Sequence, residues 1–239
     1  MQQVRYVRVG NDEYSVLISD EREALLAADA AGRAIIGLWD PNAPDRECGS
    51  ADFLVEHADD VDEPFLERVV RRRLGLPWTI CETERLAVRE ICQGDIRQIV
   101  QGKAGNGFGS REAVEAYIRH QYPVFGFGIW AVTNRQNGSL VGLAGVTVPQ
   151  ESRAEDEEWY QKRLCRGCEE VILEMGYFTF PEYRQRGYAK GACLAVMEYA
   201  SRELEAGCLL LRIARGNLPP QKMAAVLGFE RIEGKKERD

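Results

Sequence analysis

The stretch "EMGYFTFPEYRQRGYAKGA", residues 174–192, joins an apolar strand pattern to a helix pattern through a short turn rich in arginine and glycine. The first backbone N–H groups of a helix have no intrahelical partner, and the helix dipole places partial positive charge at the same end. Gly187 and Ala189 are small enough to let the backbone approach a ligand, and Arg184 and Arg186 add positive charge. The stretch therefore predicts an anion site suited to phosphate groups.

The flanking segments favour an anion site over an ordinary basic turn, which would contain the same residue types. Before the turn, "VILEMGYFTF" reads as a strand. After it, small and apolar residues recur on one helical stripe: Ala189, Cys193, Val196, Met197, Ala200 and Leu204. Further basic residues follow in the next segments, as a small anionic ligand would require: Lys190, Arg212, Arg215 and Lys222.

The composition limits the classes of protein to which the chain can belong. With 239 residues, 45% apolar and 29% charged, it is a globular chain with enough length for one or two cores. No apolar run approaches the ~18 residues of a membrane span, and the N-terminus lacks the pattern of a signal peptide. Seven scattered cysteines suit a reducing compartment, so we expect a cytoplasmic protein with free thiols.

The net charge of −7 is concentrated in the first third of the chain. Residues 1–77 contain 16 acidic and 9 basic side chains, whereas the remainder contains 22 of each. A nucleic-acid surface needs clustered lysine and arginine, so we expect no nucleic-acid partner there. Nothing in the pattern predicts binding to a membrane either.

The chain reads as two domains, residues 1–77 and 78–239. In the first, strands over 14–20, 34–39 and 51–55 and helices over 21–33 and 62–77 predict a small α/β domain. It contains neither a G-x-G-x-x-G nor a G-x-x-x-x-G-K-[ST] motif, so no nucleotide site is predicted. We interpret it as a structural or dimerising domain, which makes a homodimer one candidate assembly.

In the second domain the pattern alternates between strands and helices. Residues 78–91 read as one strand, and 94–103 and 110–122 as helices, the latter capped by Ser110. Asn137-Gly138 predicts a hairpin between 127–134 and 140–148. The charged segment 149–170 is expected to be a loop or a short exposed helix. Strand, helix, strand, helix and strand follow at 171–180, 187–206, 208–214, 219–227 and 229–232, which predicts an α/β (α+β) fold with a mixed sheet flanked by helices.

The opening stretch resembles the cofactor-binding strand, loop and helix of the GCN5-related N-acetyltransferases (GNAT). "ETERLAVREI" is similar to the first strand of the subgroup that acetylates the N-termini of ribosomal proteins. "IWAVTNRQNGSLVGLAGV" is similar to the central hairpin of the family, and "ARGNLPPQKMAAVLGFERI" to its closing strand, helix and strand. The resemblance covers residues 78–232. It implies a mostly antiparallel mixed sheet and acetyl transfer from acetyl-CoA (coenzyme A) to a primary amine of a protein, peptide or small molecule.

The resemblance also implies the residues that bind the cofactor. Phe178 and Phe180 would present backbone groups to the pantetheine arm, and Asn217 would hydrogen-bond that arm or the incoming amine. The residues that would surround the diphosphate are Arg184, Gln185, Arg186, Gly187, Tyr188 and Ala189.

For catalysis by direct attack in a ternary complex, Glu174 is the candidate base. Its alternative role is an ion pair with Arg212 or another arginine across the sheet. Many relatives have a tyrosine or serine in the last helix as the acid, but the corresponding positions here are Ala224 and Pro220. Tyr188, Tyr177 or solvent could supply that proton. A non-catalytic acyl-CoA-binding or sensor protein is the alternative function.

No metal site is predicted from the sequence. Cys165 and Cys168 have the spacing of a zinc pair, but no second pair accompanies them, and the two histidines, His57 and His120, lie in different segments. The chain ends soon after residue 232, which leaves little or nothing for the seventh strand of many GNAT relatives.

Overall fold

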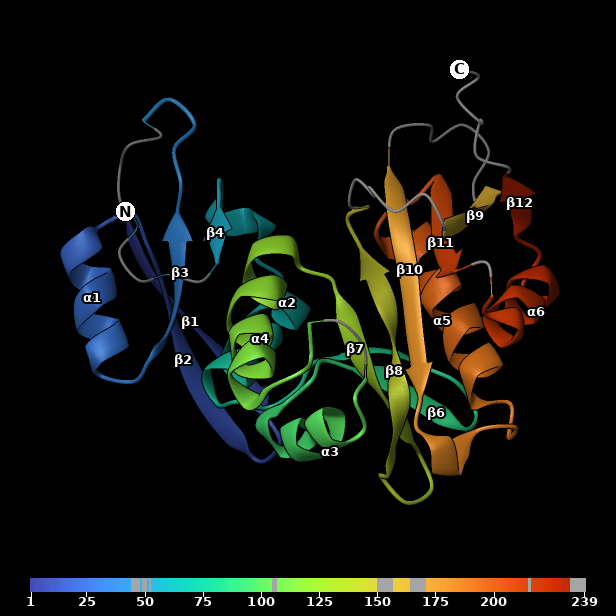
Figure 1. Cartoon of the computed structure of the whole chain (residues 1–239). Helices are drawn as coiled ribbons and strands as arrows, with labels where there is room; N and C mark the ends of the chain where they lie inside the picture. The colour runs from blue at the N-terminus through green and yellow to red at the C-terminus, as the bar shows by residue number, and fades with distance from the viewer. Residues whose placement is uncertain are drawn as a thin grey trace. The chain divides into compact units, whose positions relative to one another are not determined.

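The computed structural model describes residues 1–43, 48, 51, 53–104, 107–149, 157–163, 171–214 and 216–232 (Figure 1). Two compact units divide the chain: Met1–Trp78 with Arg119–Gly126 form the first, and Thr79–Ile118 with Phe127–Asp239 form the second. Within the described residues, no helix combines the length and the apolar character that crossing a bilayer requires.

The first unit is a four-stranded sheet in the order β1-β2-β3-β4, with β1 and β2 antiparallel and the other neighbours parallel. Its elements are β1 (Gln2–Val9), β2 (Asp12–Ser19), α1 (Arg22–Ala30), β3 (Ala34–Leu38), β4 (Leu54–Val55), the 3₁₀ turn η1 (Ala58–Asp60) and α2 (Glu63–Arg73). Strand β1 was not predicted from the sequence. It lies at the sheet edge, and its side chains alternate between arginine, glutamine and apolar residues, so no apolar run marks it.

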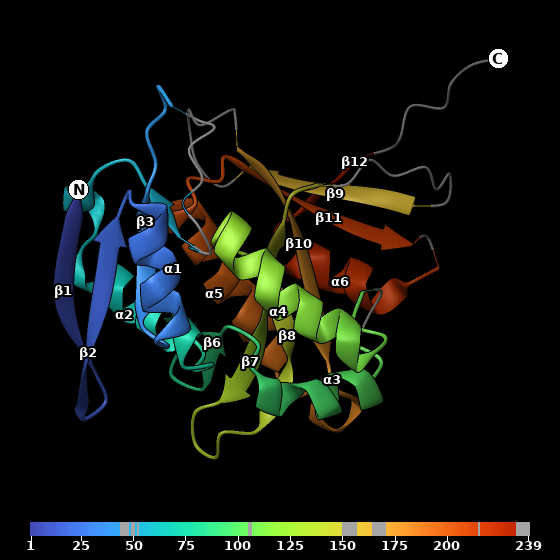
Figure 2. The same ribbon diagram turned by 90° about the vertical axis from the view of Figure 1, so that its left-hand side faces the viewer.

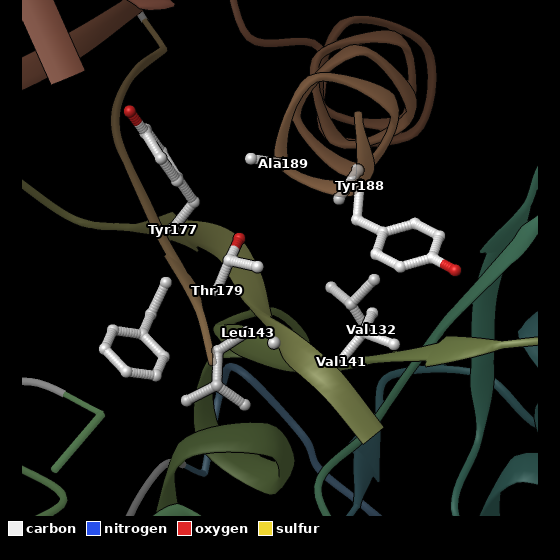
Figure 3. Close-up of a pocket in the computed structure, with 10 residues that line it drawn as sticks. Val132, Val141, Leu143, Tyr177, Thr179, Tyr188 and Ala189 are labelled. Carbon is white, nitrogen blue, oxygen red and sulfur yellow. The ribbon is translucent and has the colours of Figure 1, made fainter. Parts of the chain in front are cut away.

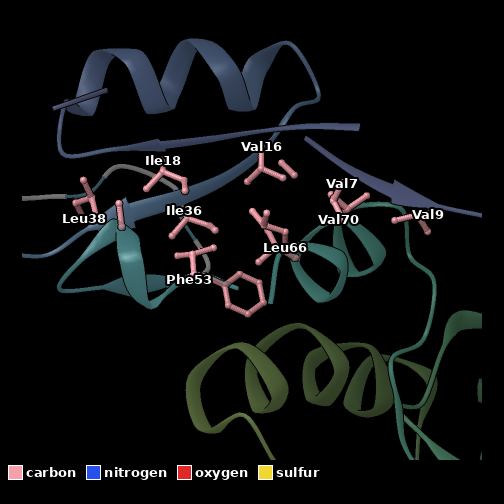
Figure 4. Packing of buried hydrophobic residues seen from close by; sticks show 13 residues of the cluster. Val7, Val9, Val16, Ile18, Ile36, Leu38, Phe53, Leu66 and Val70 are labelled. Atoms are coloured by element: carbon pink, nitrogen blue, oxygen red, sulfur yellow. The ribbon is translucent and has the colours of Figure 1, made fainter. Parts of the chain in front are cut away.

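The two faces of this sheet carry separate cores. The larger core lies between the sheet and α2, where Leu66, Val69 and Val70 pack against strand residues such as Val16 and Ile36 (Figure 4). On the other face, α1 covers a smaller cluster around Leu17, Leu25 and Ile35. The Asp62 side chain accepts a hydrogen bond from the Phe65 N–H at 2.8 Å and caps α2, as the acidic residues at the start of this helix predict.

The second unit contains an eight-stranded sheet in the order β12-β9-β11-β10-β8-β7-β6-β5. All neighbouring strands are antiparallel except β10 and β11, which confirms the expected mixed and mostly antiparallel sheet. Its elements are β5 (Thr79–Glu82), β6 (Leu86–Arg89), η2 (Gln93–Asp95), α3 (Ile96–Gln101), α4 (Arg111–Phe125), β7 (Ile129–Asn134), β8 (Leu140–Thr147), β9 (Glu157–Arg163), β10 (Ile172–Thr179), η3 (Pro181–Tyr183), α5 (Tyr188–Glu203), β11 (Cys208–Ala214), α6 (Leu218–Val226) and β12 (Glu230–Ile232). Residues 119–125 of α4 belong to the first unit.

Helices cover both faces of the larger sheet (Figure 2). On one face, α3 and the first half of α4 bury Ile96, Ile99 and Val114 against Leu143 of β8. On the opposite face α5 packs over β8, β10, β5 and β6, with Tyr199 edge-on to the fully buried Trp130 at 5.5 Å. This arrangement fixes the start of α5 at the end of β10.

Two expectations for the second unit were wrong. The segment 149–170 was expected to be a loop or an exposed helix, but residues 157–163 form strand β9, which pairs with β11 on one side and β12 on the other. Residues 78–91 form two antiparallel strands rather than one. They separate because the Thr83 hydroxyl accepts the N–H groups of Arg85 and Leu86 at 3.3 and 2.9 Å and closes a turn.

Candidate active site

The sheet opens at its centre, between β10 and β11. These strands pair over Ile172–Glu174 and Cys208–Leu210, and no further pair follows in the described residues. Strand β10 continues to Thr179 and stays paired with β8 on its other side. Among the residues that the structure describes, no strand covers this edge of β10 beyond Glu174.

The orientation of the backbone decides which groups of β10 reach this open edge. The Phe180 N–H donates to the Val141 carbonyl of β8 at 3.1 Å, and the Thr147 hydroxyl donates to the Glu174 carbonyl at 3.5 Å. The N–H and C=O groups of successive strand residues alternate in direction, so the backbone groups of the even-numbered residues of β10 point toward β8. The backbone groups of Tyr177 and Thr179 then point to the open side. The bond from Arg184 Nε to the Thr179 carbonyl, at 3.2 Å, agrees with this direction.

The open edge leads to the loop before α5. The turn η3 begins after Phe180, and two residues of the loop have left-handed backbones, Gln185 with a φ of 59° and Gly187 with a φ of 79°. Gly187 is the N-cap of α5 and supplies no side-chain bond to the helix. The first N–H groups of this 16-residue helix are thus placed at the end of the open strand edge.

Three basic side chains of this loop and of the first turn of α5 are exposed to solvent: Arg184, Arg186 and Lys190. Arg186 lies over the Tyr183 ring, with its guanidinium carbon 5.9 Å from the ring centroid. The predicted anion residues Arg184–Ala189 are therefore contiguous in space as well as in sequence, and their charge is available to a ligand.

Two residues of this region could not be found from the sequence. Arg85, in the turn between β5 and β6, donates from Nη1 to the Arg186 carbonyl at 3.3 Å, and its guanidinium carbon is 4.8 Å from the Tyr188 ring centroid. Asn134, at the end of β7, donates to the Tyr188 hydroxyl at 3.0 Å. Both lie far from residue 188 along the chain, and neither belongs to a motif with a known spacing from the loop.

A small pocket lies where β10 and the start of α5 meet (Figure 3). Tyr177, Thr179, Tyr188 and Ala189 contribute to its walls, and the hydroxyl groups of Tyr177 and Tyr188 point in different directions. Burial raises the pKa of Tyr177 above its ordinary value, and the nearby Cys193 adds to the effect. Tyr177 therefore keeps its proton at neutral pH.

The aromatic residues of the predicted site belong to the core. Phe178 and Phe180 contact each other edge to face, with ring centroids 5.2 Å apart, and Phe180 is only 1% exposed. Their rings pack with α3 and α4, on the face opposite to α5. These two residues hold the end of β10 in place, whereas the backbone groups that reach the open edge belong to Tyr177 and Thr179.

Glu174 lies at the last pair before the strands separate. Its carboxylate forms an ion pair with Arg212 of β11, at an N–O distance of 3.1 Å, and both side chains are largely buried, with exposed fractions of 21% and 16%. The structure thus contains the ion pair with Arg212 that the sequence analysis gave as the alternative role of Glu174. Glu174 and Gly187 lie at opposite ends of the open edge, because five residues from Met175 to Thr179 span roughly 16 Å of strand.

Asn217 lies beyond the end of β11, at the N-cap of α6, and is exposed. Its backbone N–H donates to the Ala214 carbonyl at 2.9 Å, and its side chain makes no capping bond to α6. Ala224, at one of the positions where relatives have an acid, is fully buried. Arg215, Cys165 and Cys168 lie outside the described residues.

Within the part of the chain that the structure describes, no group of three or more His, Cys, Asp or Glu side chains is arranged to hold a metal ion. The described cysteines are free thiols: Cys48, Cys81, Cys92, Cys193 and Cys208.

Three solved structures illustrate the proteins to which this chain is similar. An acetyltransferase from Agrobacterium tumefaciens shares 19% identity over 62% of this chain and 81% of its own, with a TM-score of 0.46. A ribosomal-protein-S5-alanine acetyltransferase from Vibrio fischeri shares 15% identity over 65% of this chain and 83% of its own, with a TM-score of 0.47. A spermidine/spermine N-acetyltransferase from Vibrio cholerae shares 18% identity over 61% of this chain and 78% of its own, with a TM-score of 0.43.

The family model of the acetyltransferase (GNAT) domain matches residues 72–230, well over half of the chain. The matched segment contains the open edge of β10, the loop with Gly187 and the ion pair of Glu174. The chain therefore belongs to the GNAT family of acetyltransferases, and it is an N-acetyltransferase.

Proposed function

We propose that the second unit transfers an acetyl group from acetyl-CoA to a primary amine by direct attack, with both substrates bound together. The observation that supports this proposal is the separation of β10 from β11 after the Glu174–Leu210 pair. It leaves a strand edge open between a carboxylate and a helix N-terminus. A thioester carrier is an extended chain with phosphates at one end, so an open edge that leads to an anion site suits it.

The residues of the loop fit the phosphate end of this cofactor. Gln185 and Gly187 have left-handed backbones, and such residues occur in anion-binding nests, in which successive N–H groups point to one side. The dipole of α5 adds partial positive charge at the same place, and Arg184 and Arg186 add full charges. We assign the diphosphate to Arg184–Ala189.

The open edge fits the pantetheine arm. This arm carries amide groups that can pair with a strand edge much as a peptide does. Tyr177 and Thr179 point their backbone groups to the open side, so we assign the pairing to these residues in place of Phe178 and Phe180. The exposed Asn217 side chain would then bond the arm or the incoming amine from the β11 side.

In this arrangement the reacting end of the cofactor lies near Glu174. The amine forms a bond to the acetyl carbon while the bond between carbon and sulfur breaks, so one proton must leave the nitrogen and one must reach the sulfur. We assign the uptake of the first proton to Glu174, directly or through a water molecule. A carboxylate is a weak base, and a weak base suits an amine with a low pKa.

A weak base favours an α-amine over a lysine side chain as acceptor, because a free α-amine titrates at pH ~8 and a lysine side chain at pH ~10.4. The source of the second proton is open among Tyr177, Tyr188 and solvent. Tyr188 lies at the phosphate end of the edge and accepts the Asn134 bond, so we expect its ring to hold the loop more than to serve as the acid. Comparing Tyr177→Phe with Tyr188→Phe separates these roles.

The test is thiol release from acetyl-CoA in the presence of α-amino peptides, polyamines or amino acids. We expect at least one class to release thiol above the background rate, and mass spectrometry to find one acetyl group on its nitrogen. No release with any class, despite tight CoA binding by calorimetry, would favour the alternative of an acyl-CoA-binding or sensor protein. Two observations motivate that alternative: the ion pair of Glu174 and the buried Ala224 at the position of the acid.

A further inference from the structure

Arg85 approaches the phosphate loop from a different hairpin. It is exposed, and it lies two residues after Thr83, whose hydroxyl accepts the Arg85 N–H at 3.3 Å. The Arg85 carbonyl accepts the N–H of Arg135, the residue after β7, at 3.0 Å. The backbone of Arg85 is therefore fixed by two neighbouring turns before its side chain reaches the loop.

The side chain of Arg85 makes two contacts with the loop at once. Its Nη1 donates to the Arg186 carbonyl at 3.3 Å, and its guanidinium lies 4.8 Å from the centroid of the Tyr188 ring. A β-carbon built on Gly187 would lie 3.9 Å from the same Nη1 atom. The guanidinium therefore lies beside the N-cap of α5.

The bond to the Arg186 carbonyl has a consequence for the next N–H group. The carbonyl of Arg186 and the N–H of Gly187 belong to one trans peptide, in which the two groups point in opposite directions. Because Arg85 binds the Arg186 carbonyl and so fixes its direction toward the Arg85 guanidinium, the Gly187 N–H must point away from that guanidinium. A left-handed glycine has little steric preference of its own, so the loop needs an outside contact to fix this peptide plane.

We propose that Arg85 is a positioning residue that aims the Gly187 N–H at the diphosphate of acetyl-CoA. This inference rests on the proposed function, because it concerns the same loop. Arg85 acts through the Arg186–Gly187 peptide and the Tyr188 ring and does not contact the phosphates. Asn134, which bonds the Tyr188 hydroxyl at 3.0 Å, supports the ring from the far side.

The test compares wild type with Arg85→Met, which removes the guanidinium but keeps an apolar stem over Tyr188. We expect Arg85→Met to raise the Kd of CoA about tenfold, the range of one lost hydrogen bond to a charged group. The KM for acetyl-CoA should rise by the same factor, whereas kcat and the KM for the amine should not change. Arg85→Lys, which keeps a donor and the charge, should bind CoA within about threefold of wild type.

The matched control is Arg202→Met, which removes the same charge from the last turn of α5, where the side chain is 74% exposed and pairs with Glu198. It should bind CoA as wild type does. All titrations use one salt concentration, because screening changes with ionic strength. Melting temperatures of all variants check that Arg85→Met remains folded.

A series of ligands separates an effect at the diphosphate from a contact with the 3′-phosphate. CoA and dephospho-CoA share the diphosphate but differ in the 3′-phosphate, and acetylpantetheine has neither. We expect Arg85→Met to lose affinity for CoA and for dephospho-CoA by the same factor. It should use acetylpantetheine with the kcat/KM of the wild type. A loss that disappears with dephospho-CoA would show contact with the 3′-phosphate and overturn the proposal, as would an unchanged Kd for CoA. If the wild type itself does not bind CoA, the proposed function fails instead.

Discussion

The Glu174 carboxylate and the Arg212 guanidinium are 3.1 Å apart on neighbouring strands, where β10 and β11 separate after the Glu174–Leu210 pair. This contact places a charged, largely buried pair at the end of the open edge where the thioester is expected. Such a pair can stabilise the branch in the sheet, and it can also keep a carboxylate ionised for proton transfer. The two roles predict different effects of substitution.

Replacing Glu174 with Gln removes the proposed base but keeps the shape of the side chain. We expect kcat to fall about 100-fold, in the range of general-base catalysis, while the KM for acetyl-CoA changes less than about twofold. Steady-state kinetics measures both values. Glu203→Gln, on the exposed end of α5, is the control and should have wild-type activity. A variant that loses thermal stability in proportion to its activity would assign Glu174 to structure alone.

The glycine at the N-cap of α5 provides a further test. In Gly187→Ala, the added β-carbon meets no atom closer than 3.9 Å, so its cost is the left-handed φ of 79°, about 1–2 kcal/mol. We expect a Kd for CoA several-fold higher, because the loop relaxes away from this φ. Gly32→Ala is the matched control, since Gly32 has a φ of 75° after α1 and no atom lies within 4 Å of the added β-carbon. It should lose similar stability in urea unfolding but keep the affinity for CoA.

Much of the fold follows from local patterns in the sequence. Strand β11 has the predicted bounds, the Asn137-Gly138 turn joins β7 and β8 as expected, and Ser110 accepts the Ala113 N–H at the start of α4. These features depend on neighbouring residues, so the sequence contains the information directly. The loop with Gly187 is also where the strand-to-helix pattern placed it.

The rest depends on partners distant in sequence. Strand β9 exists because β11 and β12 pair with its backbone, and its charged sequence gives no sign of either neighbour. Arg85 reaches the loop across 101 residues. The sequence alone favoured the backbone groups of Phe178 and Phe180 at the open edge, whereas those of Tyr177 and Thr179 point there. Only the hydrogen bond from Phe180 to Val141 shows this, because a one-residue offset reverses the direction of every backbone group.

The buried pair of Asp95 and Arg89 should make stability depend on pH. Burial alone would raise the pKa of Asp95, but two bonds from Arg89, at 2.7 and 2.8 Å, and one from the Cys92 N–H hold it below its usual value. A depressed pKa means that the pair contributes fully above the unfolded value near ~3.9 and loses its contribution as pH falls through the folded value.

We therefore expect Asp95→Asn to cost about 3 kcal/mol of unfolding free energy at neutral pH, and less in acid. Urea unfolding at both pH values measures the difference. The control is Glu115→Gln, which breaks the exposed pair with Arg111 and should cost less than about 1 kcal/mol. A deficit of Asp95→Asn that is the same at both pH values would show that the charge of Asp95 is not responsible.

Gly102 should be needed for the position of Phe180 and, through it, for the loop. A β-carbon at Gly102 would lie 2.3 Å from Cε1 of the Phe180 ring, which is buried and cannot move without disturbing its neighbours. We expect Gly102→Ala to cost about 2 kcal/mol by overpacking, and to weaken CoA binding because η3 starts directly after Phe180. Gly109→Ala, where no atom lies within 4 Å of the new carbon, should change neither. If Gly102→Ala lost stability but kept its affinity, the loop would be held from the Arg85 side alone.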